Sequence, residues 1–304
     1  MLSELLSSAD WSTPPESMEF TLRYGHLVRR VAALSAELEQ GGWGEAEARD
    51  SAGARNRAPP ALAWEEAHHK AVSLYVSAPG IVNVMLNYKI CVEHGLPLHP
   101  TVYYELKEAG RYRVEHGLPA VDKANRLYRL SIDMARSALR LEPGFQSRAE
   151  AFLAELPPEI MSFVYTGIRD AYTWRGSEPR LLEKLAQDLN TGFRPEIIIA
   201  AAHGSIMPAL LLSEILGLPL YFIRFSMFKR NDEEPILTFS DKAWLYAFKD
   251  SRALLYDEDV AGGRTLSLFA DRMGSLFGSF RTACSIRHAG SSIRPDYSAR
   301  TWWD

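Results

Sequence analysis

The sequence predicts an α/β fold: a doubly wound parallel sheet in residues 158–304, preceded by an all-helical N-terminal region, residues 1–157. Two observations predict this arrangement. After Pro157, short apolar runs of strand length alternate with helical patterns, which is typical of a parallel sheet covered by helices on both faces. Before Pro157, apolar residues recur every three or four positions, which is the spacing of helices that bury one face.

The N-terminal half begins with a clear amphipathic stripe. Its apolar residues alternate in steps of four and three: Phe20, Tyr24, Leu27, Val31, Leu34 and Leu38. The stripe predicts a helix that faces the core of a bundle, and a coiled-coil seam between subunits is the alternative. Residues 40–60 are rich in Gly, Ala and charge, and they predict a mobile loop or linker. Further helical patterns cover residues 62–76, 81–93, 124–139 and 148–156.

The C-terminal half carries the strand signals. Apolar runs predict strands at residues 196–202, 218–226, 252–257 and 280–288, with weaker ones at 235–239 and 244–248. Helical patterns lie between them, at residues 181–189, 206–217 and 265–277. In a doubly wound sheet, ligands bind beyond the carboxyl ends of the strands. The segments His203–Ser205 and Asp257–Thr265 both follow strands, so we expect them to meet at that edge.

Composition and charge argue against several classes of protein. The chain of 304 residues is 47% hydrophobic and 24% charged, which is normal for a soluble globular protein with a sizeable core. Its net charge of -4 argues against a nucleic-acid binder, which is usually basic. The N-terminus lacks the basic start of a secretion signal, and no apolar run approaches the roughly 20 residues that span a bilayer. We therefore expect a cytoplasmic protein that binds neither membrane nor nucleic acid.

The segment ALLYDEDVAGGRTL, residues 253–266, places acids directly before a glycine-rich turn. Such a turn, where it feeds a helix N-terminus, presents backbone N–H groups to a phosphate. Gly262 and Gly263 let the backbone approach closely, and the Thr265 hydroxyl offers a further hydrogen bond. Upstream, Asp257 and Glu258 can accept hydrogen bonds from vicinal ribose hydroxyls and help hold Mg²⁺. The pattern predicts a site for a 5-phosphorylated ribose.

This segment resembles, without a gap, the phosphoribosyl-pyrophosphate (PRPP) binding segment of type I phosphoribosyltransferases. The family pattern has four apolar residues, two acids, two aliphatic residues and a short loop of Thr, Ser or Ala, Gly and Thr. Asp257 and Glu258 fall on the acid pair, Gly263 on the loop glycine and Thr265 on the terminal hydroxyl. One departure is Asp259, which stands at an aliphatic position and so adds a third acid to the site or to its wall.

A second segment supports the resemblance independently. Residues 195–224 are similar to the family's first strand, pyrophosphate loop and following helix, with His203, Gly204 and Ser205 as the loop. The two segments follow each other in the family's order and at its separation. Together they cover the chain from about Pro158 to its end. In the phosphate loop, Ala261 and Gly262 replace the family's usual Thr pair, so backbone donors must take the place of hydroxyls.

The resemblance implies a Mg²⁺-dependent phosphoribosyltransferase, a pentosyltransferase that moves 5-phosphoribose from PRPP to a nitrogenous or other nucleophilic acceptor. Pyrophosphate leaves through an oxocarbenium-like transition state. Asp257 and Glu258 would hold the ribose hydroxyls and Mg²⁺, and the loop of His203, Gly204 and Ser205 would bind pyrophosphate. The 5-phosphate would bind the turn formed by Ala261, Gly262, Gly263, Arg264 and Thr265.

The same resemblance suggests residues for the two ends of the substrate. Lys229 and Arg230, in the segment after the second strand, are candidate catalytic clamps on the diphosphate. The ending RPDYSARTWWD resembles that of purine-type members, so Tyr297 and Trp302 are candidates for stacking on a small planar acceptor. We expect a homodimer, with the helical region supplying a hood over the acceptor, a dimer interface, or both.

Two other classes of function stay open at the level of sequence. One is a PRPP- or nucleotide-sensing regulatory protein that keeps the ligand site without transfer activity. The other is a partner-binding scaffold built on a transferase domain that has lost its ligand. Each acid and glycine also has a plain structural interpretation, as a solvated turn that caps the next helix. Turnover separates an enzyme from a regulator, and ligand binding separates a regulator from a scaffold.

Overall fold

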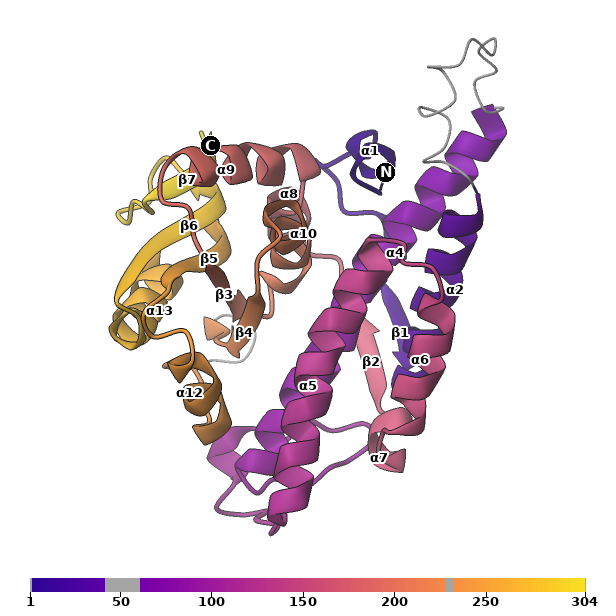
Figure 1. The fold of residues 1–304 in the computed structure, drawn as a ribbon, viewed down its shortest axis with the longest axis vertical. Helices are drawn as coiled ribbons and strands as arrows, with labels where there is room; N and C mark the ends of the chain where they lie inside the picture. Colours follow the sequence, from indigo (N-terminus) through magenta and orange to yellow (C-terminus); the bar gives the residue numbers. More distant parts are fainter. Residues whose placement is uncertain (1, 42–60, 228–231, 304) are drawn as a thin grey trace.

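A five-stranded parallel sheet forms the centre of the C-terminal half, as predicted (Figure 1). The computed structural model describes residues 2–41, 61–227 and 232–303. The strands lie in the order β4-β3-β5-β6-β7. Their bounds are β3 (Ile197–Ala202), β4 (Leu220–Arg224), β5 (Arg252–Val260), β6 (Ser279–His288) and β7 (Tyr297–Trp302).

The strand order creates a crevice between two neighbouring strands. From β3 the chain crosses to β4 on one side, whereas β5 pairs on the other side of β3 and continues to β6 and β7. Connections that leave in opposite directions diverge at the carboxyl ends of β3 and β5, which is where open α/β sheets bind ligands. Right-handed crossovers then place the connecting helices α10 (Ile206–Leu216) and α13 (Arg264–Met273) on opposite faces of the sheet.

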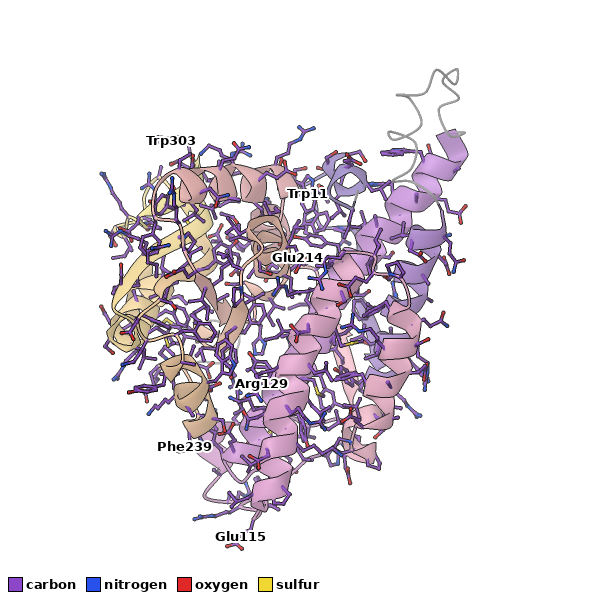
Figure 2. All side chains as sticks on the ribbon, viewed as in Figure 1. Trp11, Glu115, Arg129, Glu214, Phe239 and Trp303 are labelled. Carbon is purple, nitrogen blue, oxygen red and sulfur yellow. The ribbon has the colours of Figure 1, made fainter. Side chains whose placement is uncertain are left out.

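The N-terminal region packs beside the α10 face of the sheet, and its two long helices lie side by side (Figure 1). They are α4 (Ala61–Glu93) and α5 (Leu118–Leu139). Figure 2 labels Glu214 of α10 near α5, where Arg136 and Arg140 bind its carboxylate. The other helices are α1 (Leu2–Ser7), α2 (Tyr24–Gln40), α6 (Phe145–Ala154), α7 (Pro158–Met161), α8 (Ala171–Gly176), α9 (Pro179–Thr191) and the short 3-10 turns η1 (Glu16–Met18), η2 (Leu106–Glu108) and η3 (Gly274–Leu276).

The N-terminal region is not all-helical, which corrects the prediction. Residues Phe20–Arg23 form strand β1, which pairs antiparallel with β2 (Val164–Gly167) in a separate two-stranded sheet. The alternating burial of β1 is that of a strand, and the Phe20 ring packs against Tyr165 at 5.9 Å between centroids. The predicted stripe is helical only from Tyr24 onward. This pairing joins residues on either side of the predicted boundary at residue 157.

Two weak strand predictions are also wrong. Residues Phe239–Tyr246 form helix α12, and Ile236 makes only an isolated bridge to Arg224. The helix starts at a capping box in which the Thr238 hydroxyl accepts the Asp241 N–H and the Asp241 carboxylate accepts the Thr238 N–H. None of the described helices combines the length and apolarity that a membrane crossing needs. Residues 42–60, predicted as a mobile loop, lie outside the described residues.

The helical region covers the outer edge of the sheet. Tyr128 of α5 is fully buried, and its hydroxyl donates to the carbonyl of Phe222 at 2.7 Å and accepts from the N–H of the same residue at 3.1 Å. Phe222 lies in β4, the edge strand, whose outward-facing backbone groups would otherwise lack partners. A single side chain of α5 therefore satisfies the middle of this edge.

A buried ion network joins the helical region to the α/β part. The Lys89 ammonium of α4 has no exposed surface, contacts the Asp241 carboxylate and donates to the Thr238 hydroxyl at 2.8 Å. Glu93 lies 3.5 Å away, and Tyr221 of β4 donates its hydroxyl to Asp241 at 2.6 Å. A buried ion pair is costly to desolvate, but removing one partner costs more, because the other charge stays behind.

We therefore predict that Lys89→Met lowers the free energy of unfolding by about 3–5 kcal/mol, because Asp241 loses its buried cation. Urea denaturation followed by circular dichroism measures the change. Lys70→Met is the matched control: Lys70 lies in the same helix and pairs with Glu66 and Glu37 near the surface. It should leave the denaturation midpoint nearly unchanged. Equal effects of the two substitutions would contradict the role given to the buried network.

Candidate functional site

A cavity of about 650 Å³ lies at the carboxyl ends of β3, β4 and β5. It brings together three of the predicted segments: His203 and Gly204, the acids Asp257 and Glu258, and the turn of residues 261–265. Ser205 does not line the cavity but lies directly behind the acids. The remaining lining residues are Asp170, Tyr172, Ala201, Phe225, Ser226, Met227 and Asp259. The sequence therefore predicted one contiguous site from segments that are far apart along the chain.

The turn after β3 contributes His203 and Gly204 to the cavity, just before helix α10 begins. The peptide bond between Ala202 and His203 is cis, and the helix starts directly after Ser205. The first N–H groups of a helix have no partner within it, and together with the helix dipole they favour an anion. The turn is therefore suited to holding a phosphate group.

Gly204 is the residue that lets the turn and the acid pair approach. A Cβ placed on Gly204 would lie 1.7 Å from a carboxylate oxygen of Glu258. On the other side of the same acid, a Cβ on Gly176 would lie 3.0 Å from the Glu258 carbonyl oxygen. A side chain at position 204 would therefore displace the Glu258 carboxylate, and one at position 176 would press tightly on the Glu258 backbone.

Asp257 and Glu258 share one hydroxyl partner. The Ser205 hydroxyl oxygen lies 3.1 Å from Asp257 and 2.8 Å from Glu258, measured to the nearest carboxylate oxygens. Burial raises the pKa of Asp257 well above its usual range, and the adjacent charge of Glu258 raises it further. A hydroxyl has one proton to donate, so Ser205 can donate to only one of the two carboxylates at a time.

The turn after β5 supplies a second helix N-terminus, that of α13. Gly263 precedes the helix with a φ of +83°, and a Cβ there would lie 2.3 Å from the Cβ of Ile293. Its neighbour Gly262 has no atom within 4 Å of such a Cβ. Gly263 is therefore required by both conformation and space, whereas Gly262 is not. The Thr265 side chain faces Met227, with 3.7 Å between oxygen and sulfur.

From the sequence, Asp259 could belong either to the site or to its wall. In the structure it lines the cavity and pairs with a histidine. The His288 Nε2 atom lies 3.2 Å from the Asp259 carboxylate. Burial raises the pKa of Asp259 to about 6, although the charge and hydrogen bond of His288 act in the opposite direction. The third acid of the motif is therefore held in the cavity by a partner from β6.

The aromatic residues predicted to bind the acceptor lie elsewhere. Tyr297 opens β7, and a Cβ on Gly192 would lie 2.4 Å from its hydroxyl oxygen, so its ring packs beside the end of α9. Trp302 lies under the guanidinium groups of Arg175 and Arg300, each 5.1 Å from its ring centroid. Neither residue lines the cavity, because the segment that contains them forms an edge strand. Lys229 and Arg230, the predicted clamps, lie outside the described residues.

Two residues that sequence reasoning missed line the cavity from α8. The Asp170 carboxylate accepts hydrogen bonds from the N–H groups of Tyr172 and Thr173, both at 3.0 Å, and so caps the helix. Tyr172 is 56% exposed. In the sequence, the motif Asp-Ala-Tyr-Thr indicates the start of a helix, but it does not indicate that this helix lines the cavity.

A second cavity, of about 350 Å³, lies between the helical region and the turn after β3. Helix α4 lines it with Val76, Pro79 and Asn83, and strand β2 forms another wall. Asp170, His203 and Gly204 line both cavities. The described part of residues 1–157 thus reaches the second cavity but not the first.

The acid pair fits a magnesium ion only in combination with a ligand. Among the described residues, no group of three or more His, Cys, Asp or Glu side chains is placed to hold a metal ion. Mg²⁺ commonly binds proteins through one or two carboxylates, with water and substrate phosphates as its other ligands. Asp257 and Glu258 can supply that number of carboxylates.

No family model matches the sequence, and no curated protein matches it. Among solved structures, a purine phosphoribosyltransferase from Pyrococcus horikoshii is 29% identical, with a TM-score of 0.33. That match covers 41% of this chain and 81% of the other.

Two further solved structures match a similar share of the chain. A hypothetical protein from Neisseria gonorrhoeae with bound ppGpp is 20% identical, covering 41% of this chain and 80% of that one, with a TM-score of 0.35. The hypoxanthine phosphoribosyltransferase of Trypanosoma cruzi, in complex with the product IMP, is 16% identical, covering 42% and 77%, with a TM-score of 0.34. The chain is thus similar to purine phosphoribosyltransferases over a match that leaves more than half of it uncovered.

Proposed function

We propose that this protein is a phosphoribosyltransferase that moves 5-phosphoribose from PRPP to a nucleophilic acceptor and releases pyrophosphate. One observation carries the proposal: a single cavity is lined by an acid pair, by the turn that precedes helix α10 and by the start of helix α13. PRPP has the matching layout, with a diphosphate at one end of the ribose, a phosphate at the other and two hydroxyls between them.

Each part of the cavity has a distinct role in this proposal. The turn that contains Gly263 and Thr265 binds the 5-phosphate through backbone N–H groups and the hydroxyl. Asp257 and Glu258 accept hydrogen bonds from the ribose hydroxyls. The turn with His203 and Gly204 binds the diphosphate. The substrate would then span the crevice between β3 and β5.

The same residues favour the transition state. As pyrophosphate leaves, positive charge develops on the ribose ring, and the negative charge of the acid pair lies beside it. The N–H groups at the start of α10 meet the negative charge that develops on the leaving group. Mg²⁺, when bound by Asp257 and Glu258 together with the substrate, would supply further neutralisation of the diphosphate. Catalysis of this kind depends on positioning and charge, with no covalent bond to the protein.

The test is a calorimetric titration of PRPP with Mg²⁺ into the wild type and into Asp257→Asn/Glu258→Gln. We expect binding by the wild type and an affinity at least about 10-fold lower for the double variant, because charged hydrogen bonds to ribose are lost. Pyrophosphate release with added acceptors then separates a transferase from a regulator.

The stability of the variant provides the control. The folded state raises the pKa of Asp257 above its unfolded value, so ionising Asp257 destabilises the fold as the pH rises above the unfolded pKa. Asparagine has no charge to bury, so Asp257→Asn should melt at or above the wild-type temperature at neutral pH. A well-folded wild type that does not bind PRPP would overturn the proposal.

A pair of glycine substitutions tests the phosphate turn. We predict that Gly263→Ala lowers the affinity for ribose 5-phosphate by at least about 10-fold, because the left-handed conformation costs roughly 1–2 kcal/mol and the new Cβ collides with Ile293. Gly262→Ala, with open space around its Cβ, should bind ribose 5-phosphate within a few-fold of the wild type. Isothermal titration calorimetry measures both. Equal losses in the two variants would mean that the turn is not the phosphate site.

A further inference from the structure

Besides the two turns proposed to bind phosphate, the cavity has a third part, which is lined by acids and an aromatic ring. It is formed by Asp170 and Tyr172 at the start of α8 and by Asp259 at the end of β5. Asp259 and the acids proposed to hold the ribose line one cavity. A group attached to the ribose would therefore lie in the same cavity as these side chains.

Tyr172 provides an exposed aromatic surface at this end. Its side chain is 56% exposed although it lines a cavity, and its ring centroid lies 6.2 Å from that of His288. Its backbone is fixed, because its N–H donates to the Asp170 carboxylate that caps α8. An aromatic ring held on a fixed backbone at the mouth of a cavity suits a planar ligand, which would cover its exposed face.

The charges at this end are those of carboxylates. Asp170 and Asp259 line it, and Asp259 is oriented by His288 at 3.2 Å. Among the described residues that line the cavity, Arg264 is the only Arg or Lys, and it belongs to the phosphate turn at the start of α13. Carboxylates accept hydrogen bonds from N–H and amino groups and repel other carboxylates.

We infer that Tyr172, Asp170 and the Asp259–His288 pair form the acceptor subsite, and that it takes a planar ring bearing N–H or amino groups while rejecting rings that carry a carboxylate. This inference rests on the proposed function, because the phosphates and ribose must bind where that proposal puts them. It assigns the acceptor end to α8, β5 and β6, in place of Tyr297 and Trp302.

The experiment uses three ligands that share the ribose 5-phosphate part. Ribose 5-phosphate tests the proposed site alone, uridine 5-monophosphate adds a planar base, and orotidine 5-monophosphate adds one carboxylate to that same base. Calorimetric titration into the full chain gives the three affinities. We expect the uridine nucleotide to bind at least about 5-fold more tightly than ribose 5-phosphate, and the orotidine nucleotide at least about 10-fold more weakly than the uridine one.

Two variants locate the effects. Tyr172→Ala should abolish the gain of the uridine nucleotide over ribose 5-phosphate, and Asp259→Asn should reduce the penalty of the orotidine carboxylate. Tyr172→Ala should leave the affinity for ribose 5-phosphate within about 2-fold, because Tyr172 belongs neither to the phosphate turns nor to the acid pair. For Asp259→Asn, which adjoins Glu258, the affinities for the two nucleotides are compared with that variant's own affinity for ribose 5-phosphate. Tyr246→Ala is the matched control, since Tyr246 is 68% exposed on α12 and lines neither cavity. It should change none of the three affinities.

The outcomes separate the inference from the proposed function. If ribose 5-phosphate and both nucleotides fail to bind, the proposed function fails, and the inference fails with it. If ribose 5-phosphate binds but the uridine and orotidine nucleotides bind equally well, the phosphate site stands and the acceptor subsite is refuted. A gain from the base that survives Tyr172→Ala would likewise refute the assignment.

Discussion

The contact between the turn after β3 and the acid pair of β5 determines the shape of the site. Ser205 lies within hydrogen-bond distance of both Asp257 and Glu258, and Gly204 leaves no room for a Cβ beside Glu258. The turn after β3 and the end of β5 are thus held together by the Ser205 hydroxyl and by the close approach of Gly204 to Glu258. A larger residue at Gly204 would displace the Glu258 carboxylate from its place beside the proposed diphosphate turn.

The helical region stabilises the α/β part from the side, and none of its described residues lines the first cavity. Tyr128 satisfies the backbone of the edge strand β4, and Lys89 connects α4 to Asp241 at the start of α12. Both contacts act on the β4 side of the sheet. The region therefore acts as a support for the half of the sheet that has fewer strands beside β3.

The parts of the fold that could be predicted are those that depend on residues close together in the sequence. The apolar runs of β3 and β5, and the glycines and acids near their ends, can be recognised from a window of about a dozen neighbouring residues. What could not be predicted depends on pairing partners far away in the chain. Residues 20–23 continue a helical stripe but become a strand because residues 164–167 pair with them. Tyr297 reads as a free terminal aromatic, but β6 pairs with its segment and turns its ring toward Gly192.

A cavity with four carboxylates must still accommodate a polyanion under the proposed function, and the structure indicates how the charges balance. Asp170 faces the N-terminus of α8, which offsets its charge, and Asp259 is paired with His288. Burial raises the pKa of Asp257, which favours its protonated form while no cation is near. An incoming cation bound to the diphosphate would favour the ionised form and displace that proton. Binding of PRPP should therefore strengthen with Mg²⁺ and release protons, so that the acids contribute to affinity only when the metal and the substrate arrive together.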